Sequence, residues 1–269
     1  MSSLFRDDTP IEIHRLDGDA IHVKRDDLYG RPPAPPLAKL RGLRLLLKRL
    51  YGCGVRLVGC WDTRVSKLGQ GLAACCREFP GLRCIVSYPT KKGTQCPQSL
   101  QVASGLGAEI YPVPGSRIRI SFARARSYIE GRGGVMLPFG LECEEAVDGV
   151  RRAAAKVPRK FLLGGTLVLC CGSGVTLAGL LGGLPVLPRR IIGVSSGRAT
   201  SNILACLRRY AGDVPACLDL QEAETAYSIA ASFPCPFPAH PHYDLKAWQF
   251  LCENREHLSK PILFWNIGA

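Results

Sequence analysis

A short glycine loop in the second half of the chain has the composition of a phosphate-binding turn. Thr166–Cys171 is predicted to be a buried strand and Val175–Leu181 the helix after it. Between them, Gly172-Ser173-Gly174 lets the backbone curl, so several N–H groups and the hydroxyls of Ser173 and Thr176 can point at one anion. The spacing is neither Gly-x-Gly-x-x-Gly nor the P-loop with its lysine, which disfavours a dinucleotide or ATP. A tight strand-to-helix turn would use the same glycines, so the loop alone assigns no function.

Three other side chains could perform covalent or acid–base chemistry. Lys39 follows the proline-rich segment 31–36 at the predicted start of a helix, and its amine could attach a carbonyl compound. Tyr243 and Asp244 open the last long predicted helix, where a phenol and a carboxylate could exchange protons. On spacing alone each is ordinary, because lysine is commonly a solvated helix residue and aspartate is common in a first turn.

The order of these features resembles the aminocyclopropane-carboxylate deaminase and D-cysteine desulfhydrase family. Its members carry Lys-Arg-Asp-Asp-Leu, followed by Asn-Lys-x-Arg-Lys, and here Lys24–Leu28 matches in full with Lys39 in register. Gly172–Thr176 resembles the family's phosphate loop. Pro241–Lys246 is similar to its Val-Tyr-Glu-Gly-Lys segment, and Ile262–Gly268 to its terminal Leu-Phe-x-His-Thr-Gly-Gly. The likeness spans nearly the whole chain.

This resemblance implies an enzyme that uses pyridoxal 5′-phosphate (PLP), with the fold type II architecture of tryptophan synthase β. Lys39 would hold the cofactor covalently and then act as the proton-transfer base. Asp244 would pair with the pyridine nitrogen, and Tyr243 would act near the substrate as acid, base or nucleophile. The resemblance assigns the cofactor phosphate to the glycine loop, namely Gly172, Ser173, Gly174, Val175 and Thr176.

One segment both supports the resemblance and departs from it. Ser66-Lys67-Leu68 occupies the place of the family's Ser-Asn-His, so Ser66 would handle the substrate carboxylate. The asparagine that usually touches the PLP ring oxygen is absent, and Lys67 is a second lysine that could be catalytic or carry the cofactor. The terminal His-Thr-Gly-Gly has become Asn266-Ile267-Gly268-Ala269, and Ala38 replaces the asparagine before the PLP lysine. These changes disfavour ring-opening deamination and desulfhydration.

A second likeness is to phage-encoded PLP lyases of DNA hypermodification. It is carried by Pro35–Gly42 and Asp62–Lys67. In those systems an amino acid is attached to thymine and a PLP enzyme trims it, for instance by decarboxylation. The function expected here is therefore a PLP-dependent lyase or decarboxylase, acting at the α-carbon of an amino-acid group on thymine in phage DNA. The competing enzyme hypothesis is a deaminase or desulfhydrase of a free small amino acid.

The charge of the chain bears on its partners. The net charge is +13, which favours attraction to anions such as DNA or an acidic metabolite. Lys67 could meet the phosphate or the carboxylate of such a substrate. Basic residues on ordinary solvated helix faces would give the same sequence pattern. A third hypothesis is a catalytically degenerate PLP fold that binds nucleic acid. The basic residues form two clusters: Arg117, Arg119, Arg124, Arg126 and Arg132; and Arg151, Arg152, Lys156, Arg159 and Lys160.

Strand and helix patterns alternate along the chain, which predicts an α/β fold with parallel-rich sheets flanked by helices. The expected large PLP-binding domain comprises residues 1–42 and 138–269, with a small α/β domain inserted at 43–137. The cofactor would lie in the cleft between them. Many relatives are homodimers, so the resemblance implies a homodimer here.

The remaining composition indicates a protein of the cytoplasm, or of the host cytoplasm for a viral chain. No apolar run reaches the ~20 residues that a membrane span needs, and no signal pattern opens the chain. The thirteen cysteines show no Cys-x-x-Cys spacing and often lie in apolar runs, so we expect buried, reduced thiols. No zinc site is expected, because cysteines and histidines are not clustered at ligand spacing.

Overall fold

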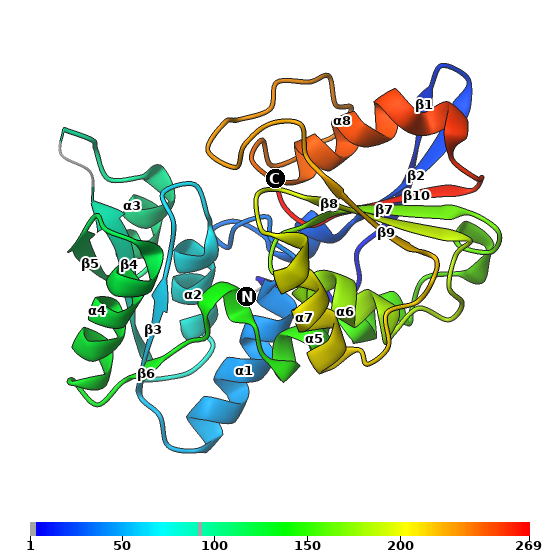
Figure 1. Ribbon diagram of the computed structural model, residues 1–269. Coiled ribbons are helices and arrows are strands. Elements are labelled where there is room, and N and C mark those ends of the chain that lie inside the picture. The colour runs from blue at the N-terminus through cyan, green and yellow to red at the C-terminus, as the bar shows by residue number, and fades with distance from the viewer. Residues whose placement is uncertain (1–3, 91–92) are drawn as a thin grey trace. The chain divides into compact units, whose positions relative to one another are not determined.

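The computed structural model describes residues 4–90 and 93–269, which fall into two compact units (Figure 1). Unit 1 is built mainly from Gly42–Leu141, with Arg31–Pro35 attached to it. Unit 2 comprises Phe5–Gly30, Pro36–Arg41 and Glu142–Ala269. Each unit has its own sheet and its own core, and the two are described in turn.

Unit 1 contains a four-stranded sheet in the order β5-β4-β3-β6, and every neighbouring pair is parallel. Its strands are β3 (Leu57–Trp61), β4 (Arg83–Thr90), β5 (Glu109–Pro114) and β6 (Val135–Met136). The helices are α1 (Leu40–Gly52), which begins in unit 2, then α2 (Leu68–Cys76), α3 (Gln98–Gly105) and α4 (Ile118–Glu130). The 3-10 turn η2 (Phe139–Leu141) ends the unit.

Helices cover both faces of the unit 1 sheet, as successive residues of β4 show. Ile85 packs in a cluster with Ile129 of α4, whereas Val86 lies against Gly69 of α2. Because neighbouring side chains of a strand point to opposite faces, α4 covers one face and α2 the other. Both contacts are close: a Cβ added at Gly69 would meet Val86 at 2.4 Å, and one at Gly59 would meet Ile129 at 2.2 Å.

Unit 2 contains a six-stranded sheet in the order β1-β2-β10-β7-β8-β9. All neighbouring pairs are parallel except the β1–β2 hairpin. The strands are β1 (Ile11–Leu16), β2 (Asp19–Arg25), β7 (Thr166–Cys171), β8 (Arg190–Ser195), β9 (Leu218–Glu222) and β10 (Ile262–Asn266). The central strand β7 is buried at every position, which explains its almost continuous apolar sequence.

Helix α8 covers one face of this sheet, and α5, α6 and α7 lie on the other (Figure 1). Trp248 and Leu251 of α8 share a core with Val168 of β7. On the opposite face, Leu177 of α6 lies beside Gly193 of β8. The helices are α5 (Glu144–Ala154), α6 (Val175–Leu181), α7 (Thr200–Tyr210) and α8 (Asp244–Asn254), with 3-10 turns η1 (Asp26–Tyr29), η3 (Arg159–Phe161) and η4 (Arg255–His257).

The structure confirms the α/β class with parallel-rich sheets and adds two strands to those predicted, β1 and β9. The β1–β2 hairpin turns at Asp17-Gly18, where both residues have positive φ values of 47° and 88°. This is the geometry that Asp-Gly favours in a two-residue hairpin. All thirteen cysteines are free thiols. No helix in the described part of the chain is long and apolar enough to cross a membrane.

Candidate active site

The end of the chain fixes the backbone beside Lys39. Leu37 and Gly268 form an antiparallel bridge, and the Ala38 N–H donates to the carbonyl of Ile267 at 2.8 Å. This pairing keeps the backbone before Lys39 extended. Helix α1 therefore begins at Leu40, one residue after Lys39. Lys39 stands at the junction of the extended segment and the helix.

The same terminal segment binds Asp244. The N–H groups of Ile267 and Gly268 donate to the two carboxylate oxygens of Asp244, at 2.9 and 3.1 Å. Asp244 is almost fully buried, and this loss of water raises its pKa to about 7 even though the backbone hydrogen bonds lower it. One strand extension thus holds both Lys39 and Asp244 at the carboxyl edge of the unit 2 sheet, the edge where open α/β sheets bind ligands.

The amine of Lys39 lies in poorly solvated surroundings. Desolvation lowers its pKa, and the positive charge of Arg198 lowers it further, while Cys170, Cys206 and Asp244 act in the opposite direction. A lowered pKa enlarges the fraction of neutral amine, which is the form that attacks a carbonyl carbon. The sequence did not single out Arg198, Cys170 or Cys206, because each becomes a neighbour of Lys39 only through the fold.

The glycine loop follows β7, the strand beside β10. Gly174 has a φ of 91° in the left-handed region and precedes the first residue of α6, Val175. A Cβ added at Gly172 would meet nothing within 4 Å, so the backbone there faces open space. Ser173 and Thr176 are buried, and the Ser173 hydroxyl has no hydrogen-bond partner among the described residues. A buried hydroxyl without a partner beside open backbone is a cradle for an anion.

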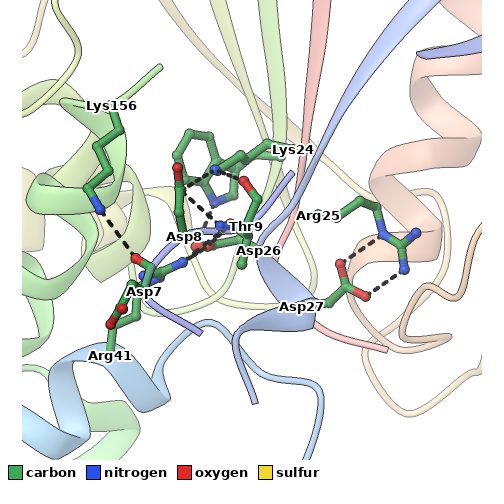
Figure 2. A network of polar contacts seen from close by, with 10 residues as sticks. Asp7, Asp8, Thr9, Lys24, Arg25, Asp26, Asp27, Arg41 and Lys156 are labelled. Atoms are coloured by element: carbon green, nitrogen blue, oxygen red, sulfur yellow. Dashed lines mark hydrogen bonds and ion pairs between the residues drawn. The ribbon is translucent and has the colours of Figure 1, made fainter. Parts of the chain in front are cut away.

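The Lys24–Leu28 segment, which carries much of the family resemblance, forms a buried polar network (Figure 2). Asp26 is fully buried and accepts two bonds from Arg41, at 2.7 and 3.1 Å. It also accepts from the Thr9 hydroxyl at 3.0 Å and the Trp265 indole N–H at 3.3 Å. Because Arg41 lies two residues after Lys39, Asp26 anchors the helix turn that follows the candidate lysine.

The other charges of this segment are paired as well. Arg25 donates to both carboxylate oxygens of Asp27, at 3.0 and 2.9 Å, and a third bond reaches Glu12 at 2.8 Å. Lys24 donates to the Thr9 carbonyl and, at 3.2 Å, to Asp8. Each charge of the motif thus has an opposite charge or a carbonyl beside it, and its role here is structural.

Tyr243 precedes Asp244 at the start of α8, and its hydroxyl shares a hydrogen bond with that of Tyr227 at 2.7 Å. The carbonyl of Tyr227 lies 2.9 Å from Nδ1 of His242. Sequence reasoning missed Tyr227, since it lies in an irregular segment with no motif around it. The pairing couples the proton of Tyr243 to a second phenol.

Ser66 and Lys67 belong to unit 1, whereas Lys39, Asp244 and the glycine loop belong to unit 2. Helix α2 begins at Leu68, whose N–H donates to the Ser66 hydroxyl at 3.1 Å. The buried Asp62 accepts the Gly69 N–H at 2.6 Å, and desolvation raises its pKa to about 6. Lys67 is half-buried, and partial loss of water lowers its pKa.

Comparison with known proteins identifies one curated relative over the full length. The chain is 30% identical over 276 aligned residues to a glycyl-dTMP PLP-dependent decarboxylase of Pseudomonas phage M6, covering 97% of this chain and 98% of the relative. No family model matches.

Solved structures show the same fold. An ACC deaminase homologue aligns with a TM-score of 0.80 at 21% identity, over 99% of this chain and 90% of the other. A hydrogen sulfide-producing enzyme from Fusobacterium nucleatum aligns with a TM-score of 0.68 at 15% identity, over 99% and 94%. The likeness assigns the tryptophan synthase β-like architecture, and at these identities it carries the fold alone.

Proposed function

Because the chain belongs to the family of fold type II PLP-dependent enzymes that includes the phage glycyl-dTMP decarboxylase, we propose that it binds PLP and decarboxylates an amino-acid group carried by a thymidine nucleotide in DNA. The supporting observation is the assembly in unit 2 of Lys39, Asp244 and the glycine loop at one edge of one sheet. We expect free, unmodified amino acids to be poor substrates.

The residues of unit 2 fit the cofactor. Ser173 offers a buried hydroxyl that no described residue bonds, and Gly172 leaves its backbone open, as a phosphate-binding loop requires. Asp244 is a buried carboxylate whose pKa is raised to about 7 by desolvation. A cationic ring nitrogen beside it would favour its ionised form, since opposite charges stabilise each other. Gly174, Val175 and Thr176 complete the loop proposed for the phosphate.

Lys39 would hold the cofactor and then move a proton. Bound PLP supplies an electron sink for the pair left on the α-carbon when a substituent departs. In decarboxylation the bond from the α-carbon to the carboxylate breaks, carbon dioxide leaves, and one proton is added to the α-carbon. Lys39 would deliver that proton, a task suited to an amine whose pKa is lowered toward neutrality by desolvation.

The remaining predicted site residues have supporting roles in this proposal. Tyr243, hydrogen-bonded to Tyr227, would act as an acid near the substrate. Ser66 and Lys67 would meet the anionic groups of the substrate, its carboxylate or its phosphate. The lowered pKa of Lys67 reflects partial burial, so pairing with a substrate anion would be stronger there than at a fully solvated lysine.

The test supplies the PLP-loaded protein with glycyl-dTMP, as a free nucleotide and within a duplex oligonucleotide, and with free glycine and alanine. We expect carbon dioxide release and retention of the amine on the thymidine product, measured by gas capture and mass spectrometry. Ammonia release would instead indicate a deaminase. A protein that takes up no PLP and gains no absorbance near the blue edge of the visible would indicate a nucleic-acid-binding module on this fold.

A further inference from the structure

A groove on unit 1 contains none of the residues proposed to hold the cofactor. It has a volume of about 720 Å³ and runs between β5 and α4. Helix α4 lines it with Ile120, Arg124 and Tyr128, residues spaced by four along one stripe, and Arg119 lies on its border. On the strand side, Tyr111 stacks on Tyr128 with ring centroids 3.7 Å apart. The groove therefore combines two cations with aromatic and apolar surface.

The charges of the groove are uncompensated. Arg119 and Arg124 are exposed, and within residues 4–90 and 93–269 neither guanidinium forms an ion pair or a hydrogen bond. The nearby acid Glu109 is already engaged by Arg132 and by the Tyr128 hydroxyl, the latter at 2.7 Å. Positive charge thus remains at the groove for a partner from outside the chain.

Two arginines of the second basic cluster, Arg151 and Arg152, behave differently. On α5, Arg152 pairs with Asp148 at 2.6 Å, and Arg151 lies 3.5 Å from Asp148 and 3.6 Å from Glu144. These arginines are largely neutralised by acids of their own helix. The two arginines of the groove differ in this from Arg151 and Arg152, since they have no acid of their own helix beside them.

The edge of the sheet beside the groove excludes one common kind of partner. β5 is the edge strand, and Pro112 and Pro114 within it have no N–H to donate. An added peptide strand would lack those bonds, so β-strand addition is disfavoured. Arginine forks suit phosphate oxygens, and exposed Ile118 and Ile120 suit the less polar sugar surface between them.

We propose that the β5–α4 groove binds the phosphodiester backbone of duplex DNA. The identity of the polyanion rests on the proposed function, in which the thymidine nucleotide is part of DNA. The groove and its unpaired arginines lie in unit 1, and the paired arginines of α5 lie in unit 2. None of these observations depends on a catalytic step. Arg119 and Arg124 are the phosphate contacts, and they carry affinity without reading sequence.

The test measures fluorescence anisotropy of a labelled, unmodified 30-base-pair duplex with the full chain at 50 to 200 mM salt. R119Q/R124Q is compared with R151Q/R152Q, which removes the same charge from the paired cluster. We expect the first to weaken binding at least about tenfold at 50 mM salt and to reduce the slope of log affinity against log salt by about 2. The second should stay within about twofold of wild type, and R119K/R124K should retain most of the binding.

Three results would overturn the proposal: no duplex binding by the wild type at 50 mM salt, equal losses in the two Gln pairs, or displacement of DNA by polyglutamate at equal charge concentration. Thermal melting of every variant establishes whether it is folded. If R119Q/R124Q does not fold, R119K/R124K still tests how binding depends on the arginines. Because the duplex is unmodified, binding is scored without turnover. A protein that binds through Arg119 and Arg124 but releases no carbon dioxide would contradict the proposed function and leave this inference standing.

Discussion

Two groups of buried charges in unit 2 lie at the carboxyl edge of the same sheet, and they differ in how their charges are compensated. In the network of Figure 2, Asp26 is matched by Arg41, and Asp27 by Arg25. In the candidate site, the carboxylate of Asp244 accepts backbone amides, and burial raises its pKa to about 7. The pKa of Lys39 is likewise moved toward neutrality by desolvation.

This difference separates a scaffold from a reactive centre. The ion pairs of the network fix its geometry, and at Asp27 the partner Arg25 acts against the desolvation that raises the pKa of that carboxyl. In the candidate site no such ion pair with a described residue acts on Asp244, and burial raises its pKa while lowering that of Lys39, which suits both groups to exchanging protons. The two groups are physically joined, because Arg41 of the network follows Lys39 of the site on one helix turn.

Lys39→Ala should have the largest effect on chemistry. It removes the amine that would hold the cofactor and transfer the proton, and proton transfer alone is worth about 10²- to 10⁴-fold in rate. The matched control is Lys48→Ala, an exposed lysine on the same helix, which should leave turnover unchanged. Decarboxylation rates and thermal melting are measured for both. Turnover within tenfold of wild type in Lys39→Ala would remove Lys39 from the mechanism.

Asp26→Ala should have the largest effect on stability. It leaves the Arg41 guanidinium buried without its carboxylate, a loss worth about 3–5 kcal/mol in the free energy of unfolding. The control is Asp148→Ala, whose partners Arg151 and Arg152 are more solvated, so its cost should stay below about 1 kcal/mol. Urea unfolding followed by circular dichroism measures both. Equal costs would mean that the network is no more important than a surface pair.

Asp244→Asn should change the pH dependence of stability in the cofactor-free protein. The folded pKa of about 7 lies above the ordinary 3.8, so the folded state binds the extra proton and stability falls as pH rises through this window. At about 1.4 kcal/mol per pKa unit, the decrease is at most about 4 kcal/mol. Asp62, with its pKa raised to about 6, contributes with the same sign and remains in the variant.

Urea unfolding at pH 4, 5.5, 7 and 8 checks this expectation. The variant should lose the larger part of the decrease, and added PLP should reduce it in the wild type because a ring cation would favour ionised Asp244. An unchanged profile in Asp244→Asn would show that this carboxyl titrates in its ordinary range.

Ser66→Ala should cost about 1 kcal/mol in stability, less than Asp26→Ala, because it removes one hydroxyl that accepts the Leu68 N–H and bonds the Asp62 carboxyl. If Ser66 also meets the substrate carboxylate, KM should rise while the amount of bound cofactor stays constant. Steady-state kinetics and PLP absorbance separate the two roles. A loss of bound PLP in this variant would place Ser66 at the cofactor instead.

Much of this fold could be predicted from local pattern, and the exceptions have local causes. The strand β7 and the helix α6 have their predicted bounds, because a continuous apolar run and a glycine turn are strong signals. β1 was missed although Ile11 and Ile13 alternate with polar residues before Asp17-Gly18, a signal for a hairpin. β9 was missed because it is a half-buried edge strand, in which no residue is fully buried to mark a core face.

The candidate site was harder to resolve by sequence. The Lys24–Leu28 motif identified the family, but only the contacts showed that it is a paired network. The partners of Lys39 and Tyr243, such as Arg198 and Tyr227, are distant along the chain and carry no periodicity. By contrast, the neutralisation of Arg151 and Arg152 follows from helix spacing, three and four residues after Asp148, and could have been predicted.

Whether Lys39 holds the cofactor is tested directly by reducing the PLP-loaded protein with borohydride, followed by digestion and mass spectrometry of the peptides. We expect a pyridoxyl group on the peptide that contains Lys39, its loss in Lys39→Ala and its persistence in Lys48→Ala. A label on the peptide that contains Lys67, or no label on any lysine, would contradict this expectation.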